Sequence, residues 1–328
     1  MSDEESFDPS FIVDALAELV LGEAPNLKRA DVARLSGLSP EVTRARWRAL
    51  GFPEVGDDDV AFTQADVEAL GMAQQLIDLG VINDETEQAF IRTIGRTFSR
   101  LAEWEVRAML VALFADAGDP KVAAERLGML EELIPLGERI QTYAWRRHLV
   151  GAASRLALTD TQVDVAEDTC IGFADIVGYT TRSRRMTARE LAELVERFES
   201  VVAGLITDHH GRVIKSIGDE ILFATDDVRD AASLALDLLE QHEQDKTFPQ
   251  IRVGMSYGRV MNRLGDVYGP VVNLASRLTN VARPGHAVID HDMAAQLKGD
   301  EDFRLRRMRR TSVKGFELQE MWSLKRPR

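Results

Sequence analysis

The sequence has a single cysteine, Cys170, so no disulfide can form within one chain. It also lacks any uninterrupted apolar stretch near the ~18 residues that a membrane-spanning helix requires. Its first residues, 1–5, are acidic, whereas a secretory signal begins with positive charge. These three absences predict a cytoplasmic protein that lives in a reducing compartment and does not bind membranes.

An excess of positive charge is missing as well. The chain of 328 residues carries 40 Lys and Arg against 54 Asp and Glu, which gives a formal net charge of -14. Surfaces that bind nucleic acids or anionic membranes in a general way are basic, so this balance argues against both partners. A site for an anionic nucleotide must then be positive locally, through side chains, backbone N–H groups or bound cations.

The length predicts two domains, and the character of the sequence changes near its middle. Apolar residues recur at helical spacing through residues 1–156, which predicts an all-helical domain whose last helix covers about 135–156. Residues 157–167 lack this periodicity and are predicted to be a linker. From residue 168 to residue 328, short apolar runs alternate with helical patterns, which predicts a second domain of mixed structure.

The second half follows the order β-α-β-β-α-β. The predicted strands are residues 169–176, 212–217, 220–225 and 251–256, with a turn at 257–258 and a closing strand pair at 304–314 and 320–324. The first helix begins at a capping box made by Thr187 and Glu190, and it stops at residues 209–211. This order predicts a ferredoxin-like α+β fold with additional elements.

Two aspartates in this half each follow an apolar run and lie beside a glycine-bearing turn. Asp175 lies in Phe-Ala-Asp-Ile-Val-Gly-Tyr-Thr (173–180), and Asp219 lies in Ile-Lys-Ser-Ile-Gly-Asp-Glu (214–220). A carboxylate at the end of a strand is exposed and fixed, which suits a hard cation such as Mg²⁺. Each aspartate alone is more typical of an ordinary turn, so it is the pair that indicates a metal site.

A backbone segment and a lysine add the means to bind a nucleotide. If the turn after Asp175 leads into a helix, its free N–H groups can cradle phosphate oxygens. The residues concerned are Ile176, Val177, Gly178, Tyr179 and Thr180. Lys215 has apolar neighbours in a predicted strand, so it needs a partner, for which an adenine nitrogen or Asp266 is suitable. A solvated lysine is the alternative. Lys215 and Asp219 are four residues apart, and this spacing alone does not decide whether they serve one triphosphate or two different sites.

A third stretch, residues 266–277, reads Asp-Val-Tyr-Gly-Pro-Val-Val-Asn-Leu-Ala-Ser-Arg. Pro270 is typical of the first turn of a helix. That helix places Asn273 and Arg277 four residues apart on one face. Arg277 can then reach a phosphate while Asn273 holds a ribose. The alternative is an ordinary amphipathic helix with a polar outer face.

Together and in this order, the three motifs resemble those of the catalytic domain of class III adenylyl and guanylyl cyclases, over residues 168–324. The resemblance implies three roles: two Mg²⁺ or Mn²⁺ ions per active site bound by Asp175 and Asp219, adenine recognition by Lys215 and Asp266, and catalysis by Asn273 and Arg277. One departure is Tyr179, where the family usually has Phe. It does not alter the implied chemistry.

The family resemblance also implies how the molecule assembles and what it makes. Cyclases of this class build each active site at a head-to-tail interface, so a homodimer is expected. The pair of Lys215 and Asp266 favours ATP over GTP, which implies an adenylate cyclase that converts ATP to 3′,5′-cyclic AMP and pyrophosphate. Residues 1–156 resemble the helical N-terminal domains of some bacterial cyclases and are expected to regulate and to dimerise.

Three alternatives remain open on the sequence: a guanylyl cyclase, a nucleotide sensor without activity, and a DNA-binding regulator. The last rests on residues 27–70, where a helix, a glycine turn and a basic helix with Arg44, Arg46 and Arg48 resemble a helix-turn-helix of the MerR type. The acidic run 57–59 follows closely, and this fold also serves protein contacts. Nucleic acid is therefore not the expected partner.

Overall fold

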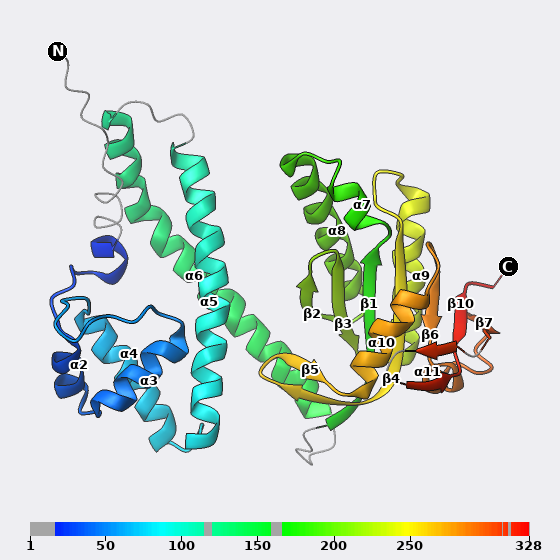
Figure 1. The fold of residues 1–328 in the computed structure, drawn as a ribbon, viewed down its shortest axis with the longest axis horizontal. Helices are drawn as coiled ribbons and strands as arrows, with labels where there is room; N and C mark the ends of the chain where they lie inside the picture. The colour runs from blue at the N-terminus through cyan, green and yellow to red at the C-terminus, as the bar shows by residue number, and fades with distance from the viewer. Residues whose placement is uncertain (1–16, 115–119, 159–165, 310, 314–315, 328) are drawn as a thin grey trace. The chain divides into compact units, whose positions relative to one another are not determined.

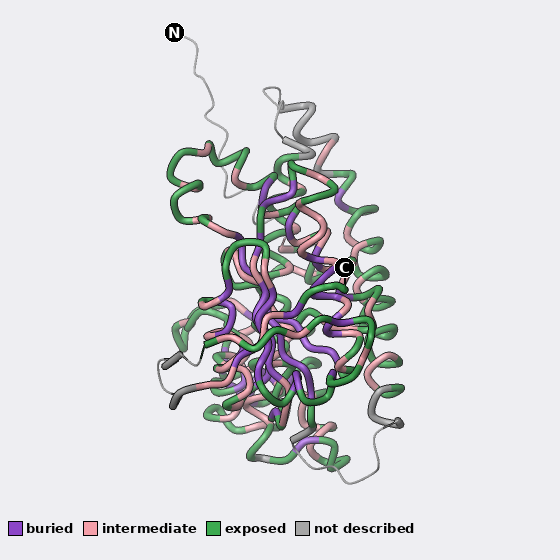
Figure 2. Tube along the Cα trace, turned by 90° about the vertical axis from the view of Figure 1, so that its right-hand side faces the viewer, coloured by how far each residue is buried: buried purple, intermediate pink, exposed green. Residues whose placement is uncertain are grey.

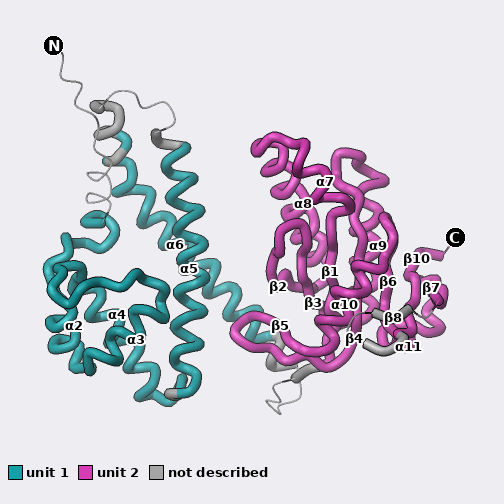
Figure 3. Tube along the Cα trace, in the orientation of Figure 1, with its two compact units in different colours: residues 1–161 teal, residues 162–328 magenta. Residues whose placement is uncertain are grey.

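The computed structural model describes residues 17–114, 120–158, 166–309, 311–313 and 316–327. The chain forms two compact units, residues 1–161 and 162–328 (Figure 3). No helix in the described part of the chain is both long and apolar enough to cross a membrane.

The first unit is built from helices, as predicted (Figure 1). They are α2 (Arg29–Ser36), α3 (Pro40–Leu50), α4 (Gln64–Asp78), α5 (Asp84–Phe114) and α6 (Pro120–Leu158). Val32 of α2 packs with Phe62 and with Val67 and Leu70 of α4, which forms a small buried core. Because α5 and α6 are far longer than α2, α3 and α4, much of their apolar surface remains exposed.

The predicted helix-turn-helix is present, but its three basic side chains, Arg44, Arg46 and Arg48, all form ion pairs within the unit. Helix α2 ends at Gly37 in the left-handed conformation (φ 71°), and α3 follows after a short turn. Arg46 is only 2% exposed and donates to the carboxylate of Glu87. Arg44 donates to the carboxylate of Asp57. A DNA-reading helix needs free basic side chains, so these ion pairs argue against the DNA-binding alternative.

The helix predicted over residues 135–156 begins much earlier than predicted, because α6 starts at Pro120 and continues through Pro135. Proline favours the first turn of a helix, where its missing N–H is not needed, and the sequence therefore indicates a start at Pro135. Inside α6 it removes the hydrogen bond to the carbonyl of Glu131, at a cost of about 3 kcal/mol. The hydrogen-bonded turns on both sides outweigh that cost, since extending a formed helix is favourable.

A mixed sheet of eight strands forms the core of the second unit (Figure 1). Its order is β2-β3-β1-β4-β6-β10-β7, with β5 paired to β4. The strands are β1 (Ala166–Ile176), β2 (Arg212–Ile217), β3 (Glu220–Thr225), β4 (Ile251–Arg263), β5 (Asp266–Tyr268), β6 (Ala287–Ile289), β7 (Arg304–Arg307) and β10 (Trp322–Lys325). The first four strands are antiparallel neighbours in the ferredoxin-like order, which confirms the predicted fold class.

Helices cover both faces of this sheet, and the alternation of side chains along β1 distinguishes the faces. They are α7 (Tyr179–Ser183), α8 (Ala188–Asp208), α9 (Val228–Gln244), α10 (Pro270–Val281) and α11 (His291–Gln296). Ala174 belongs to the core shared with α8, α9 and α11, whereas Phe173 belongs to the core shared with Ala275 of α10. Buried residues line the strands between these layers (Figure 2). By the same alternation, Asp175 lies on the α10 face.

The capping box predicted for the first helix of this unit is confirmed in α8. The hydroxyl of Thr187 accepts from the N–H of Glu190, and the carboxylate of Glu190 accepts from the N–H of Thr187. The hairpin of β2 and β3 also has the predicted bounds. Its loop is Gly218-Asp219, where Gly218 takes a positive φ of 66°. These local signals therefore position Asp219 at the tip of the hairpin.

The turn predicted at residues 257–258 is wrong, because β4 continues through it to Arg263. The chain reverses instead at Leu264-Gly265, and Arg263 pairs with Asp266 across this two-residue loop. Both loop residues have positive φ, 56° and 77°, as a tight hairpin turn of the primed type requires. Leucine rarely adopts this conformation, so the sequence gives no sign of the hairpin.

The closing strand pair is only partly as predicted. In place of the two strands predicted at 304–314 and 320–324, residues 304–325 contain four strands, of which β7 and β10 pair at the edge of the main sheet. The other two, β8 (Thr311–Val313) and β9 (Phe316–Gln319), pair with each other in a separate hairpin. Residues 310, 314 and 315 lie outside the described part of the chain.

Candidate active site

The two predicted metal-binding aspartates lie at neighbouring ends of the sheet strands. Asp175 is the penultimate residue of β1 and is buried, while Asp219 lies in the loop between β2 and β3. The N–H of Ile176 donates to the carbonyl of Asp219 over 3.1 Å, which fixes the loop beside the end of β1. Burial raises the pKa of Asp175, the guanidinium of Arg252 opposes that rise, and the carboxylate of Asp219 adds to it.

Two charged residues at this place were not singled out by the sequence analysis. Arg252 donates from Nε to Oδ2 of Asp175 over 2.6 Å, and from Nη1 to the backbone carbonyl of Asn280 in α10 over 3.2 Å. Glu220 stands opposite Asp175 in the β1–β3 register. Burial raises the pKa of Glu220 to about 7, and the charges of Asp175 and Asp219 add to the rise. Three carboxylates and one guanidinium therefore lie together at the end of β1.

This excess of carboxylates is what a divalent cation would relieve. The carboxylates of Asp175 and Asp219 are close enough to raise the pKa of Asp175, although charged oxygens repel each other in a partly buried place. Oxygen ligands of this kind suit Mg²⁺ or Mn²⁺. Within the described residues, no group of three or more His, Cys, Asp or Glu side chains is arranged to hold a metal. A cation here would thus take its remaining ligands from water or a bound phosphate.

Lys215 and Asp266 form an ion pair, although 51 residues separate them in the chain. Nζ of Lys215, in β2, lies 2.5 Å from Oδ2 of Asp266, in β5. The other oxygen of Asp266 accepts from the N–H of Val267 over 2.9 Å, which orients the carboxylate. Both side chains are partly exposed, so a bound molecule can reach them. The β4–β5 hairpin, which the sequence did not predict, is the element that brings Asp266 to Lys215.

Helix α10 carries Asn273 and Arg277 on its outer side. Pro270 is its first residue, as predicted, and Leu278 is buried against Val288 of β6. Asn273 is exposed and Arg277 is half-buried. Among the described residues, neither side chain has an ion pair or a hydrogen bond. Both amide and guanidinium are therefore available to a ligand.

Comparison with known proteins agrees with these motifs. The adenylate and guanylate cyclase catalytic domain family matches residues 161–326. The chain belongs to the class III cyclases. A protein of Glutamicibacter nicotianae called "Adenylate cyclase" is 38% identical over 328 residues, covering 94% of this chain and 81% of that protein.

Another protein called "Adenylate cyclase", from Streptomyces coelicolor, is 38% identical over 285 residues, covering 86% of this chain and 74% of that protein. Among solved structures, the adenylyl cyclase CyaB from P. aeruginosa matches with a TM-score of 0.45 and 22% identity. That match covers 52% of this chain and 98% of that one.

A single cyclase domain does not bring all six predicted residues into one cluster. Asp175 pairs in register with Arg252 near the start of β4, whereas Asp266 pairs with Arg263 at its end. The structure accordingly records two separate groups, one with the two aspartates and Arg252, the other with Lys215 and Asp266.

The backbone segment predicted to bind phosphate is only partly free. The N–H of Ile176 donates to Asp219, and the N–H of Val177 donates to the carbonyl of Gln250 over 2.9 Å. Gly178 caps α7, a helix of five residues. Within the described residues, the N–H groups of 178–180 have no backbone acceptor. In this cyclase domain, only these last three N–H groups remain available to phosphate.

Proposed function

We propose that this chain is an adenylate cyclase that converts ATP to 3′,5′-cyclic AMP and pyrophosphate. The observation that carries the proposal is the ion pair of Lys215 and Asp266, at 2.5 Å, which joins two of the family's motifs. Membership of the class III cyclases gives the reaction type, and both curated relatives described above are called adenylate cyclases. The Lys215–Asp266 pair indicates which nucleotide base the site accepts.

The pair offers a donor and an acceptor side by side. An ammonium group donates to the unprotonated N1 of adenine, and a carboxylate accepts from the 6-amino group. Guanine carries a hydrogen on N1 and an oxygen at position 6, so the same arrangement would set donor against donor and acceptor against acceptor. Such mismatches favour ATP, because with guanine the polar groups of the pair and of the base are left unpaired.

The carboxylates of Asp175 and Asp219 would hold the two divalent cations, since their mutual repulsion in a partly buried place is relieved by positive charge. Bound there, Mg²⁺ or Mn²⁺ would lower the pKa of the ribose 3′-hydroxyl and offset the charge of the phosphates. Arg252 anchors the carboxylate of Asp175 to α10 through Asn280 and so limits its orientations.

The remaining groups position the substrate. The 3′-hydroxyl oxygen attacks the α-phosphorus, the bond to the bridging oxygen breaks, pyrophosphate leaves, and the hydroxyl proton passes to solvent. The guanidinium of Arg277 would stabilise the charge that builds on the phosphoryl oxygens, and the amide of Asn273 would hold the ribose. The N–H groups of residues 178–180 would bind phosphate oxygens.

We propose that each site is completed by a second copy of the chain, in a head-to-tail homodimer. One chain keeps the two aspartates and the Lys215–Asp266 pair at opposite ends of β4. Apolar side chains near the second group are exposed: Met261, Leu264 and Tyr268 of the β4–β5 region are between 39% and 48% exposed. Exposed apolar groups beside an incomplete site favour a protein interface there.

Residues 1–156 are proposed to be the regulatory and dimerisation domain, joined to the cyclase domain (168–328) by residues 157–167. The support lies on α6, where four apolar residues recur at spacings of four, three and seven, as in a coiled coil. They are Leu136, Ile140, Tyr143 and Val150, and each is at least 50% exposed. A second copy of α6 would bury this stripe, and would thereby link the two cyclase domains.

The decisive experiment is to incubate the purified chain with Mn²⁺ and with ATP or GTP, and to identify the product by mass spectrometry. Cyclic AMP from ATP, with a much lower rate from GTP, is the expected result. Formation of cyclic GMP from GTP at a higher rate than cyclic AMP from ATP would favour the guanylyl alternative. No cyclic nucleotide with either substrate would contradict the proposal.

A further inference from the structure

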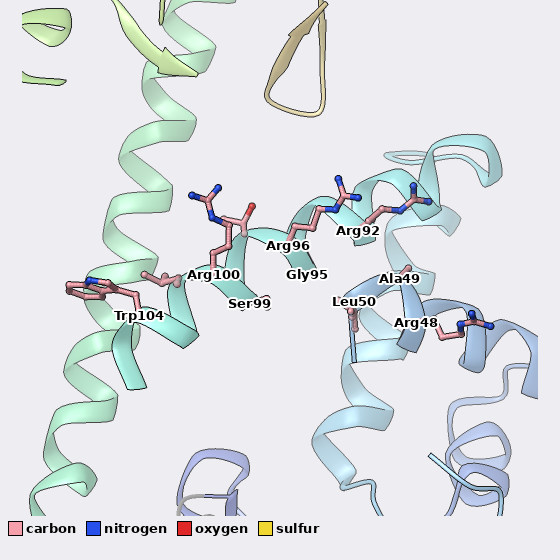
Figure 4. Close-up of a pocket in the computed structure, with 12 residues that line it drawn as sticks. Arg48, Ala49, Leu50, Arg92, Gly95, Arg96, Ser99, Arg100 and Trp104 are labelled. Atoms are coloured by element: carbon pink, nitrogen blue, oxygen red, sulfur yellow. The ribbon is translucent and has the colours of Figure 1, made fainter. Parts of the chain in front are cut away.

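The first unit contains a groove lined by arginines, distinct from the cyclase domain. It lies between the C-terminal end of α3 and the middle of α5 and has a volume of about 920 Å³ (Figure 4). Four arginines line it: Arg48 of α3, and Arg92, Arg96 and Arg100 of α5. We call the cavity that these four residues line the arginine groove. Its volume falls within the range of small-molecule sites.

Close packing of two helices forms the floor of the groove. A Cβ atom added at Gly95 of α5 would lie 2.2 Å from the backbone carbonyl oxygen of Leu50, the last residue of α3. The two backbones are therefore in contact at this point, and longer side chains next to it, such as those of Arg92 and Arg96, line the sides of the groove. Figure 4 shows the side chains of Arg92, Arg96 and Arg100 projecting from one side of α5.

Most of the positive charge of the groove is not balanced by the protein: Nη1 of Arg48 lies 3.9 Å from Oε2 of Glu54, but the three arginines of α5 lack such a partner within the described residues. Other arginines at α5 do have acidic partners: Arg46 of α3 pairs with Glu87 of α5, and Arg107 of α5 pairs with Glu103. By contrast, Arg92, Arg96 and Arg100 have no acidic partner within the described residues. They follow each other at a spacing of four residues, and like charges at that spacing destabilise a helix. The chain has 54 acidic residues, yet none of them pairs with these three arginines within the described residues. We infer from this that an external anion binds them.

The spacing of the guanidinium groups indicates how many charges that anion carries. Four residues of helix rise about 6 Å, so three arginines extend over about 12 Å. A single carboxylate or phosphate group could bind the guanidinium of one of these arginines, or of two at most. A guanidinium binds phosphate oxygens in a bidentate manner, and a row of them matches a row of phosphates.

We propose that the arginine groove binds a small anion with two or three linked phosphate groups. The same chemistry occurs in inorganic polyphosphates and in the phosphate chain of a nucleotide. A nucleic acid is disfavoured, because the net charge of -14 repels a long polyanion and the three arginines of α3 are already paired with acidic side chains. A short anion needs only the local positive field of the groove.

The test is a calorimetric titration of the full-length chain with inorganic tripolyphosphate, in the presence of EDTA so that the metal-dependent cyclase site does not contribute. Replacing all three arginines of α5 (R92Q, R96Q and R100Q together) should weaken binding at least 10-fold. The matched control is R139Q, R146Q and R147Q together, which removes the same charge from exposed positions of α6 and should leave the affinity unchanged. Pyrophosphate and ATP, titrated in the same way, distinguish the two sources of the phosphates.

A second readout locates the anion. Trp104 lines the end of the groove and is 67% exposed, so its fluorescence should change on binding, and Trp104→Phe should abolish that change. The groove variant should unfold at the same temperature as the parent or higher, because it loses only like-charge repulsion. Absence of binding, or equal weakening in the groove and control variants, would overturn the proposal. A change in oligomeric state without any effect of tripolyphosphate would show instead that the stripe binds an acidic protein surface.

Discussion

Arg277 is the side chain whose removal should harm turnover most selectively. It lies half-buried on α10 without a partner among the described residues, so its guanidinium is held near the site but not neutralised. Losing one preorganised charge stabiliser typically lowers turnover about 10²-fold or more. We therefore expect Arg277→Ala to reduce kcat by that factor while changing KM little, in initial-rate measurements with ATP and Mn²⁺.

Asn280→Ala provides the control, because Asn280 lies on the same helix, is exposed, and contacts Arg252 only through its backbone carbonyl. Its kcat should stay close to that of the parent. A near-parental kcat for Arg277→Ala would remove Arg277 from the catalytic role.

Asp266 should determine which base is accepted. Asp266→Asn replaces one accepting oxygen by an amide that donates, and it breaks the ion pair with Lys215. A lost hydrogen bond to a charged group costs about 1.5–3 kcal/mol, so kcat/KM for ATP should fall about 10- to 100-fold. The rate with GTP should fall less, and the preference for ATP should therefore shrink. Asp226→Asn, in an exposed pair with Arg212, should leave both rates unchanged.

Asp290 makes stability depend on pH. It caps α11 and accepts from the hydroxyl of Ser256, and burial raises its pKa to about 6. Between about pH 4 and pH 6 the unfolded chain has lost this proton while the folded chain retains it, so this group lowers the free energy of unfolding as pH rises. Urea unfolding at several pH values should show a flatter dependence over that range in Asp290→Asn. An unchanged slope would contradict the assignment.

At the scale of elements, the contact between α10 and β4 supports the position of Asn273 and Arg277. A Cβ atom at Gly254 of β4 would lie 2.0 Å from the backbone nitrogen of Thr279, so Gly254→Ala must displace α10. Overpacking of this kind costs about 1–3 kcal/mol, and displacing a catalytic group by about 1 Å can lower turnover 10²-fold. Thermal unfolding and initial rates should both show the loss.

Gly204→Ala is the matched control for that change. Gly204 lies inside α8, and a Cβ atom there would meet nothing within 4 Å. Alanine in place of glycine in a helix favours folding by up to about 1 kcal/mol, so this variant should be as stable as the parent or more so. Equal losses in both variants would show that activity does not depend on the α10–β4 contact.

Elements with local signals were predictable from the sequence, and elements without them were not. The capping box of α8 and the glycine loop between β2 and β3 are encoded by a few adjacent residues. The β4–β5 hairpin turns at Leu264, where the conformation comes from the pairing of two strands and not from the residue. The early start of α6 was missed for a related reason, since helix on both sides overrides the preference of Pro135.

The same division applies to the site. The three motifs identify residues because each keeps its acids and amides close together in the chain. Arg252 reaches Asp175 across neighbouring strands, and its place as the second residue of a predicted strand looked unremarkable. Glu220 directly follows Asp219 in a quoted motif, and its proximity to Asp175 depends on the β1–β3 register. Contacts of this kind can be predicted only when it is known which strands pair and in which register.

At the scale of the whole molecule, a second copy is required if the six residues act together. Asp219→Ala removes a residue of one half of the site, and Arg277→Ala removes a residue of the other half. Each variant alone should then be nearly inactive, because both sites of its dimer are defective. In an equal mixture of subunits, half of the dimers contain both variants, and each of these has one intact site out of two.

Co-expression of Asp219→Ala with Arg277→Ala should therefore restore about a quarter of the parental activity, measured as cyclic AMP formed per subunit. The control is Asp219→Ala with Asp175→Ala. Both aspartates are proposed to come from the same subunit, so every site in that mixture lacks one of them and no activity should return. If mixed dimers form but the first pair stays inactive, or if the second pair recovers equally, the six residues do not converge across a head-to-tail interface, and each chain would have to complete its own site by bringing the ends of β4 together.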